Sequence, residues 1–193
     1  MEFLKLVEKN RSYRRFDAGY PIDVRLLREL IALARITPSA ANKQPLKYIL
    51  SCSAQWNGKI HEALRWAGYL PEWGGPVPAE RPTAYIVVLL DTTIAARADM
   101  DVGIVSQTML LSAVERGLGG CMLANVDKDA LAKTLALPAH LAVALVIALG
   151  KPVERIILED RPAGGSIKYY RDAAQGHHVP KRTAAELIYK EYA

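Results

Sequence analysis

The chain has 193 residues, of which 51% are hydrophobic and 23% are charged. This balance is typical of a globular protein and excludes the disordered and fibrous classes. The length suffices for one sizeable core, and no shift in composition marks a boundary, so we expect a single domain over residues 1–193. The longest apolar run, Leu141 to Leu149, is about half of the ~20 residues that a membrane-spanning helix needs. No membrane partner is therefore expected.

Charge and cysteine content exclude further classes. The net charge is +5, but the lysines and arginines are spread along the chain without a run of five or more, which argues against a nucleic-acid partner. A small ligand that carries phosphate would need only about two or three well-placed cations. Cys52 and Cys121 have no companion at the spacing of a disulfide framework or a zinc site. The first residues lack the apolar stretch of a signal peptide, so we expect a cytoplasmic protein.

The first half of the chain mixes helices and strands. Apolar residues at helical spacing behind Asp23, a suitable N-cap, predict an amphipathic helix over residues 23–36. Runs rich in Ile, Val, Tyr and Leu predict strands over residues 46–52 and 83–90. Between these strands we expect another helix, whose apolar stripe consists of Ile60, Ala63, Leu64 and Ala67. Its continuation, residues 71–82, is rich in Gly and Pro and is predicted to be a loop.

The second half contains the longest predicted helix, over residues 99–116, which Gly117 would cap. Because its apolar residues lie on nearly every face, we expect it to be buried all round. A strand over residues 120–124, a short helix over 127–137 and a central strand over 141–149 follow. This order lacks the regular alternation of a doubly wound fold, so the fold class is predicted to be α+β.

The tail differs from the rest of the chain. Residues 151–182 show no sustained period and include three prolines. Because a structureless stretch of this length is unusual in a compact domain, we expect it to pack against a second copy of the chain. Thr183 and Glu186 then have the spacing of a capping box, which predicts a helix start with Lys181 and Arg182 just outside it.

Two segments in the first quarter could bind a ligand. Residues 10–16 gather three arginines, including Arg11 and Arg14, beside Ser12; arginine offers forked donors that suit phosphate or a carbonyl-rich ring. The alternative for this cluster is a solvated basic turn, in which Arg15 is the member most expected to be only surface. Residues 38–45 combine small residues with Ser, Asn and Gln, which permit close approach of a flat ligand and hydrogen bonds to its edges, although an ordinary turn remains an alternative.

Later candidates are weaker on their own. The glycines of residues 117–120 follow a helix instead of a strand, which excludes a dinucleotide-binding fingerprint. They instead lead into a strand whose end, at Leu123, Ala124 and Asn125, could present backbone N–H groups to a ligand. Lys181 and Arg182 beside a helix start could bind phosphate. His177 and His178 have no carboxylate or cysteine partner at useful spacing, so no metal site is predicted.

Taken in order, these segments resemble the nitroreductase family of FMN-dependent enzymes. The matching segments are Arg11-Ser12-Tyr13-Arg14, residues 38–45, the helix segment Asp101 to Gln107, residues 117–121, residues 149–152 and Pro180-Lys181-Arg182. The family's first motif often opens with two arginines, whereas this chain has Asn10 at the first position. Leu46 stands where an aromatic residue often follows the Gln-Pro pair. No family residue can be placed within the loop 71–82.

The resemblance implies a fold and a cofactor. It implies a mainly antiparallel central sheet flanked by helices, an obligate homodimer with FMN at the subunit interface, and a C-terminal arm that reaches the partner subunit. One chain would contribute Arg11, Ser12 and Arg14 to the flavin, together with Lys181 and Arg182 at its phosphate and the backbone near Leu123, Ala124 and Asn125. The partner would contribute the 38–44 segment, whose candidate residues are Pro38, Ser39, Ala40, Asn42 and Gln44.

The activity that the resemblance implies is a ping-pong transfer of hydride. NADH or NADPH would reduce the flavin at N5, and a small electron-poor acceptor such as a nitroaromatic or quinone would reoxidise it. No catalytic residue is required beyond the flavin, with Arg14 in a supporting electrostatic role. Alternatives are another reaction on the same fold, such as that of a dehalogenase, an azoline oxidase or a flavin-consuming enzyme, or a flavin-binding sensor with little turnover.

Overall fold

The computed structural model describes residues 1–193, which divide into two compact units. The main unit comprises Met1–Trp66 and Gly74–Val153, and the tail unit comprises Ala67–Trp73 and Glu154–Ala193. No helix is both long enough and apolar enough to cross a membrane.

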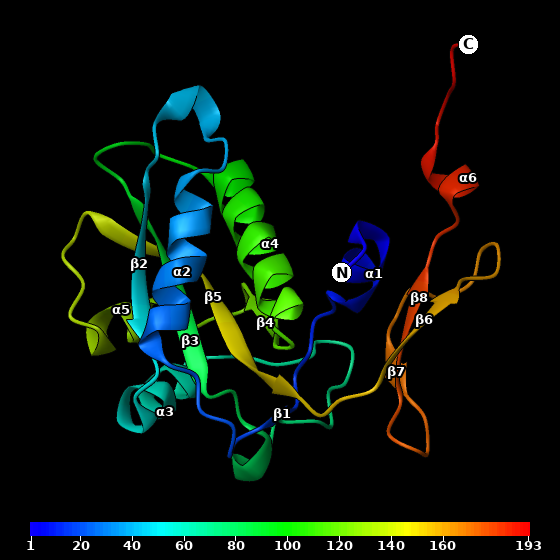
Figure 1. The fold of residues 1–193 in the computed structure, drawn as a ribbon, viewed down its shortest axis with the longest axis horizontal. Helices are drawn as coiled ribbons and strands as arrows, with labels where there is room; N and C mark the ends of the chain where they lie inside the picture. Colours follow the sequence, from blue (N-terminus) through cyan, green and yellow to red (C-terminus); the bar gives the residue numbers. More distant parts are fainter. The chain divides into compact units, whose positions relative to one another are not determined.

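The main unit is built on a five-stranded antiparallel sheet (Figure 1). Its strands are β1 (Phe16–Asp17), β2 (Leu46–Ser51), β3 (Ala84–Asp91), β4 (Gly119–Leu123) and β5 (Leu141–Pro152). β5 pairs with β1, β3 and β4, and β2 pairs with the free edge of β3. The predicted strands and the mainly antiparallel sheet are thus confirmed, and the central strand continues three residues beyond Leu149.

Helices cover both faces of this sheet. They are α1 (Phe3–Lys9), α2 (Val24–Arg35), α3 (Ala54–Glu62), α4 (Asp99–Glu115) and α5 (Lys128–Thr134), with short 3-10 helices η1 (Ala40–Asn42) and η2 (Pro78–Glu80). The apolar sides of α2 and α4 pack together on alternate residues of β3 and β5 and form a hydrophobic core cluster. Figure 1 shows α2 and α4 side by side. α3 contacts β3 and α5 contacts β5.

Helix boundaries follow the predicted capping signals. The Asp23 side chain accepts a hydrogen bond from the Arg25 N–H at 2.7 Å, as expected for the N-cap of α2. Gly117 has a positive φ of 73° after α4, and Leu118 N–H donates to the Ala113 carbonyl, so the chain turns directly into β4. Only glycine adopts this conformation without strain.

Two helix predictions were wrong. The stripe of Ile60, Ala63, Leu64 and Ala67 does not form one helix, because α3 ends at Glu62 and Ala67 has a φ of 42°. α4 is not buried all round either, since Met100 is 73% exposed and Ile104 is 38% exposed. The apolar residues of α4 therefore form two surfaces: one faces the core, and the other is exposed on the main unit.

No helix or strand was predicted between residues 151 and 182, but the structure contains three strands there. The tail unit contains β6 (Ile156–Asp160), β7 (Tyr170–Arg171) and β8 (His177–Lys181), which form a three-stranded sheet in the order β6-β8-β7. Its strands are short and two of them pair in parallel, so they leave little periodic signal in the sequence. The capping box of Thr183 and Glu186 is present and starts α6 (Ala184–Leu187), as predicted.

The close packing of β4 gives a test of the main-unit core. A Cβ on Gly120 would overlap the Ala148 carbonyl oxygen and the Leu110 side chain, whereas a Cβ on Gly58 of α3 would meet nothing. We expect Gly120→Ala to lower the free energy of unfolding by about 1–3 kcal/mol through overpacking. Gly58→Ala, the matched control, is expected to raise it by about 0.5–1 kcal/mol because alanine favours the helix. Urea unfolding measures both, and equal effects would contradict the packing of β4.

Candidate functional site

The arginine cluster is fixed to the edge of β4. Ser12 forms a parallel bridge with Gly120, and the Tyr13 N–H donates to the Gly120 carbonyl at 3.0 Å. The Tyr13 ring occupies the space where a side chain on residue 119 would lie, which explains the glycine there. The segment is therefore an ordered extension of the sheet, and the alternative of a merely solvated turn does not describe it.

Arg11 and Arg14 are held by backbone carbonyls. Nη2 of Arg11 donates to the Val7 carbonyl at 2.7 Å, and Nη1 of Arg14 donates to the Ser12 carbonyl at 3.1 Å. Both side chains are half-buried, and Nε of Arg11 is buried without a hydrogen-bond partner. An unpaired buried donor is costly, so such a group is satisfied when an acceptor binds beside it.

Arg15 has a different role. Its Nε and Nη2 donate to the two carboxylate oxygens of Glu80 at 2.7 and 2.6 Å, and both side chains are about three-quarters buried. This forked pair ties the chain before β1 to η2. The expectation that Arg15 is only a surface charge was wrong, because its guanidinium is a structural clamp on Glu80.

The 38–45 segment is an ordered loop anchored on the first turn of α4. The Asp101 carboxylate, only 3% exposed, accepts hydrogen bonds from the Ser39 hydroxyl and, at 3.1 Å, from the Ala40 N–H. The Ser39 oxygen in turn accepts from the Gln44 N–H at 2.9 Å. Sequence reasoning placed Asp101 in a matching segment but missed this role, because residues 39 and 101 are remote in the chain.

The loop has an unusual backbone. Ala41, Asn42 and Gln44 all have positive φ, between 48° and 53°, and the side chains of Asn42 and Gln44 hydrogen-bond to each other. Left-handed conformations at non-glycine residues store strain and occur preferentially at ligand sites. Pro38, Ala40, Asn42 and Gln44 are exposed on this loop.

The two groups of candidate residues lie toward opposite ends of α4. Asp101 is in its first turn, whereas Gly120, beside Ser12, packs against Leu110 in its last turns. A helix of 17 residues is about 25 Å long. Arg11, Ser12 and Arg14 are therefore not brought together with the 38–44 segment within one chain.

The remaining candidates lie elsewhere. Leu123 ends β4 and is buried, and the exposed Ala124 lines a cavity of about 550 Å³ together with Asp99 and Val102 of α4. Asn125 is exposed, and its carbonyl accepts a hydrogen bond from the Arg65 N–H. Lys181 and Arg182 belong to the tail unit, where Lys181 ends β8, Arg182 follows it, and both are exposed.

The adjacent histidines of the tail unit do not form a metal site. The structure contains no group of three or more His, Cys, Asp or Glu side chains that could hold a metal ion. His178 lies between two carboxylates, with Nε2 at 3.0 Å from Asp172 and Nδ1 at 2.9 Å from Glu159. The hydrogen bonds to Asp172 and then to Glu159 raise the pKa of His178.

This arrangement predicts a pH dependence of the tail unit. Because the folded pKa of His178 is raised, its stabilising effect is fully present below the unfolded pKa of about 6.5 and is lost as the pH rises through the folded value. We expect an NMR titration to show the His178 ring titrating above about 6.5, and Asp172→Asn to lower that pKa. Asp160→Asn, on the neighbouring exposed position of β6, is the control. An unchanged titration in Asp172→Asn would contradict the ion pair.

Tryptic cleavage after Lys43, which is exposed in the 38–45 loop, tests whether Asp101 holds this loop in place. Asp101→Asn removes the charge that holds Ser39 and Ala40, and hydrogen bonds to a charged group contribute about 1.5–3 kcal/mol. We therefore expect tryptic cleavage after Lys43 to become about 10–100 times faster under native conditions. Asp99→Asn, a position 88% exposed on the same helix, should leave the rate unchanged. Equal rates in both variants would show that Asp101 does not hold the loop.

Comparison with known proteins was consistent across sequence and structure. The family model described as Nitroreductase family matches residues 7–151. An Archaeoglobus fulgidus protein with the provisional name NADH dehydrogenase/NAD(P)H nitroreductase is 27% identical over 159 residues, which cover 78% of this chain and 86% of that protein.

Solved structures share the fold. A protein of Desulfovibrio desulfuricans, provisionally named a nitroreductase and crystallised with FMN, gives a TM-score of 0.71 at 23% identity over 100% of this chain and 98% of its own. A gut-bacterial enone reductase of fatty-acid saturation gives 0.68 at 19% identity over 80% and 90% of the two chains. Because the family model spans about three-quarters of the sequence, including the arginine cluster, the 38–45 loop and β4, the chain belongs to the nitroreductase family.

Proposed function

We propose that the protein binds FMN and, as a homodimer, transfers reducing equivalents from NADH or NADPH to a small electron-poor acceptor such as a nitroaromatic or a quinone. The observation that carries this proposal is the ordered pair Arg11 and Arg14 at the edge of β4, with a buried Nε of Arg11 that lacks an acceptor. Membership of the nitroreductase family and the FMN found in the Desulfovibrio desulfuricans structure support the choice of cofactor.

The donors of the site fit a flavin mononucleotide. The guanidinium groups of Arg11 and Arg14 and the hydroxyl of Ser12 suit the phosphate, the ribityl chain and the carbonyl-bearing edge of the ring. Pro38, Ser39, Ala40, Asn42 and Gln44 form the second set, in which small side chains permit close approach of the backbone and the amides hydrogen-bond to ring edges. Leu123, Ala124 and Asn125 complete the proposed site with their backbone.

Two chains are needed because the arginine cluster and the 38–44 segment lie toward opposite ends of α4. An apolar surface of the main unit supports such a dimer: Phe3 and Leu4 of α1 are 72% and 67% exposed, and Met100 and Ile104 of α4 are also exposed. Adjacent exposed apolar residues on contacting helices indicate a protein–protein interface. The loop of one chain would then meet the arginine cluster of the other.

The tail unit is proposed to act in the same assembly, as part of one functional domain over residues 1–193. Leu187 and Ile188 are exposed, as are Tyr189 and Tyr192 near the C-terminus, which fits an arm that packs on a partner subunit. Lys181 and Arg182 precede this arm and would add positive charge at the FMN phosphate.

The chain's own residues would serve binding and electrostatics. When bound, FMN would supply the redox chemistry, namely the transfer of reducing equivalents from the nicotinamide to the acceptor. Arg14 would stabilise the negative charge that the pyrimidine edge of the ring gains on reduction. The Ser39 loop, fixed by Asp101, would orient the ring and exclude water from one side.

A second reaction on the same site is supported by one comparison. The enone reductase with a TM-score of 0.68 shares this fold, so an α,β-unsaturated carbonyl is a second candidate acceptor. A different flavin reaction would use other acceptors, and a flavin-binding sensor would show little turnover. The experiment described next separates both alternatives from the proposed activity.

The deciding experiment starts with purified protein incubated with FMN and freed of excess flavin. We expect yellow protein with about one FMN per chain, bleached anaerobically by NADH or NADPH and reoxidised by a nitroaromatic or quinone. Reoxidation by an enone alone would favour the second reaction, and retained flavin without bleaching would favour the sensor. Failure to retain FMN would overturn the proposal.

The role of Arg14 is tested in the same assay. Arg14→Ala removes a charged donor, so FMN is expected to bind about 10–100 times more weakly and to be reduced more slowly. Arg28→Ala, an exposed arginine on α2, is the matched control and should retain wild-type flavin content. Unchanged binding and reduction in Arg14→Ala would remove this residue from the site.

A further inference from the structure

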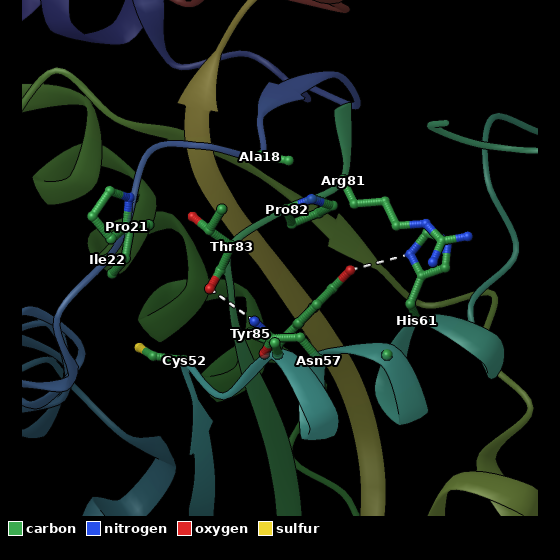
Figure 2. A pocket seen from close by; sticks show the side chains of 12 residues that line it. Ala18, Pro21, Ile22, Cys52, Asn57, His61, Arg81, Pro82, Thr83 and Tyr85 are labelled. Atoms are coloured by element: carbon green, nitrogen blue, oxygen red, sulfur yellow. Dashed lines mark hydrogen bonds between the residues drawn. The ribbon is translucent and has the colours of Figure 1, made fainter. Parts of the chain in front are cut away.

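A second cavity lies in the main unit, where β2 ends and β3 begins (Figure 2). It has a volume of about 320 Å³ and is lined by residues from the segment before α2, from α3 and from the start of β3. None of its lining residues belongs to the candidate flavin site. β2 separates it from the 38–45 loop, which precedes the opposite end of that strand. The cavity therefore needs an explanation of its own.

One wall of this cavity is apolar. Ala18, Pro21 and Ile22 line it from the segment before α2, and Pro82 lines it from the start of β3. In Figure 2, Pro21 and Ile22 lie on the side away from Arg81 and His61. Such a wall favours the carbon skeleton of a ligand over a compact inorganic ion.

The opposite side carries a neutral histidine that Tyr85 orients. The Tyr85 hydroxyl lies 3.2 Å from Nδ1 of His61 (Figure 2). Burial, followed by the charge of Arg81, lowers the pKa of His61 to about 4, and burial raises the pKa of Tyr85, so both groups are uncharged at neutral pH. Tyr85 is 1% exposed and its hydroxyl needs an acceptor, so we assign the hydroxyl as the donor and Nδ1 as the acceptor of this hydrogen bond. The remaining proton of His61 is then on Nε2, available to a ligand.

Arg81 supplies a positive charge that no side chain of the protein neutralises. It forms no ion pair, while the adjacent Glu80 is engaged by Arg15. No Asp or Glu lines the cavity. The nearby carboxylate of Asp23 interacts electrostatically with the lining residue Cys52, but it is already paired with Arg25 at 2.9 Å. The Arg81 side of the cavity therefore carries one positive charge without a carboxylate partner.

Thr83 adds an unused hydrogen-bonding group. Its Oγ1 is buried and has no hydrogen-bond partner. Asn57, in contrast, is already engaged: its amide donates to the Thr83 carbonyl at 2.8 Å and its oxygen accepts from Ser51. Arg81, His61 and Thr83 can therefore all donate a hydrogen bond to a ligand in the cavity, and only the Thr83 hydroxyl can also accept one.

We propose that this cavity is a binding site for a small organic monocarboxylate with an apolar body. Arg81 and Nε2 of His61 bind the carboxylate, and Pro21, Ile22 and Pro82 contact the body. A single cation matches a monoanion better than a phosphate dianion, and the apolar wall adds affinity that inorganic anions cannot use. This site is separate from the proposed flavin site and does not depend on it.

The test uses benzoate as the probe and uncharged benzamide as its isosteric control, added to the full-length, FMN-treated protein. Backbone amide signals in ¹H–¹⁵N NMR spectra report the site of binding. We expect benzoate to shift the signals of Gly58 and His61 in a saturable manner and benzamide to leave them nearly unchanged. Shifts confined to residues 11–14, 39–44 and 123–125 would place benzoate in the flavin site and overturn the proposal, as would the absence of saturable shifts.

Variants complete the test. Arg81→Ala should weaken benzoate binding at this cavity about tenfold or more, because a charge-assisted hydrogen bond is lost. Thr83→Val keeps the side-chain shape and removes the hydroxyl, so it should weaken binding to a smaller extent. Arg28→Ala, an exposed arginine outside the cavity, should bind as the wild type does. Wild-type affinity in Arg81→Ala, with unchanged thermal unfolding, would show that Arg81 does not bind the carboxylate.

Discussion

Burial of β5 on both faces is the constraint on which the main unit depends. The strand pairs with β1, β3 and β4, and residues Val146 to Leu149 are completely buried. Its alternate residues meet α2 and α4 on one face, while α5 contacts it as well. Every element that presents a candidate flavin residue of the main unit is tied to this strand directly or through one neighbour. The arginine cluster, for example, is positioned by two pairings: Ser12 bridges Gly120 of β4, and Gly120 pairs with Leu149 of β5.

The same packing separates the two sets of candidate flavin residues. α4 lies across the sheet with the Asp101-anchored loop at its start and the arginine cluster near its end. A helix is stiff over this length, so motion of one chain does not bring the sets together. The exposed apolar side chains of α1 and α4 offer a simple solution, in which two copies place the loop of one beside the cluster of the other. Dimerisation would then be a requirement of the site itself.

Much of the main unit could be predicted locally. The N-cap Asp23, the turn at Gly117 and the doubly apolar run from Leu141 each act through neighbouring residues, and each is present in the structure. The predictions fail where a pattern has two physical causes. α4 is apolar all round, yet part of that surface is exposed, because an apolar helix face can lie on the core or on the surface of the unit. The short strands of the tail unit escaped prediction because parallel pairing between distant residues leaves little local pattern.

The sequence by itself determined the α+β class, the family resemblance and the residue types of the candidate flavin site, because periodicity, capping and motifs are local properties. Only the tertiary structure decided the roles of Asp101 and Arg15 and the surroundings of Arg81. Asp101 holds Ser39 from 62 positions along the chain, and Arg15 pairs with Glu80 across 65. Arg81 stands beside His61 without a carboxylate partner. Hydrogen bonds and charge balance depend on distances in space, and those distances exist only once the sheet has brought remote segments together.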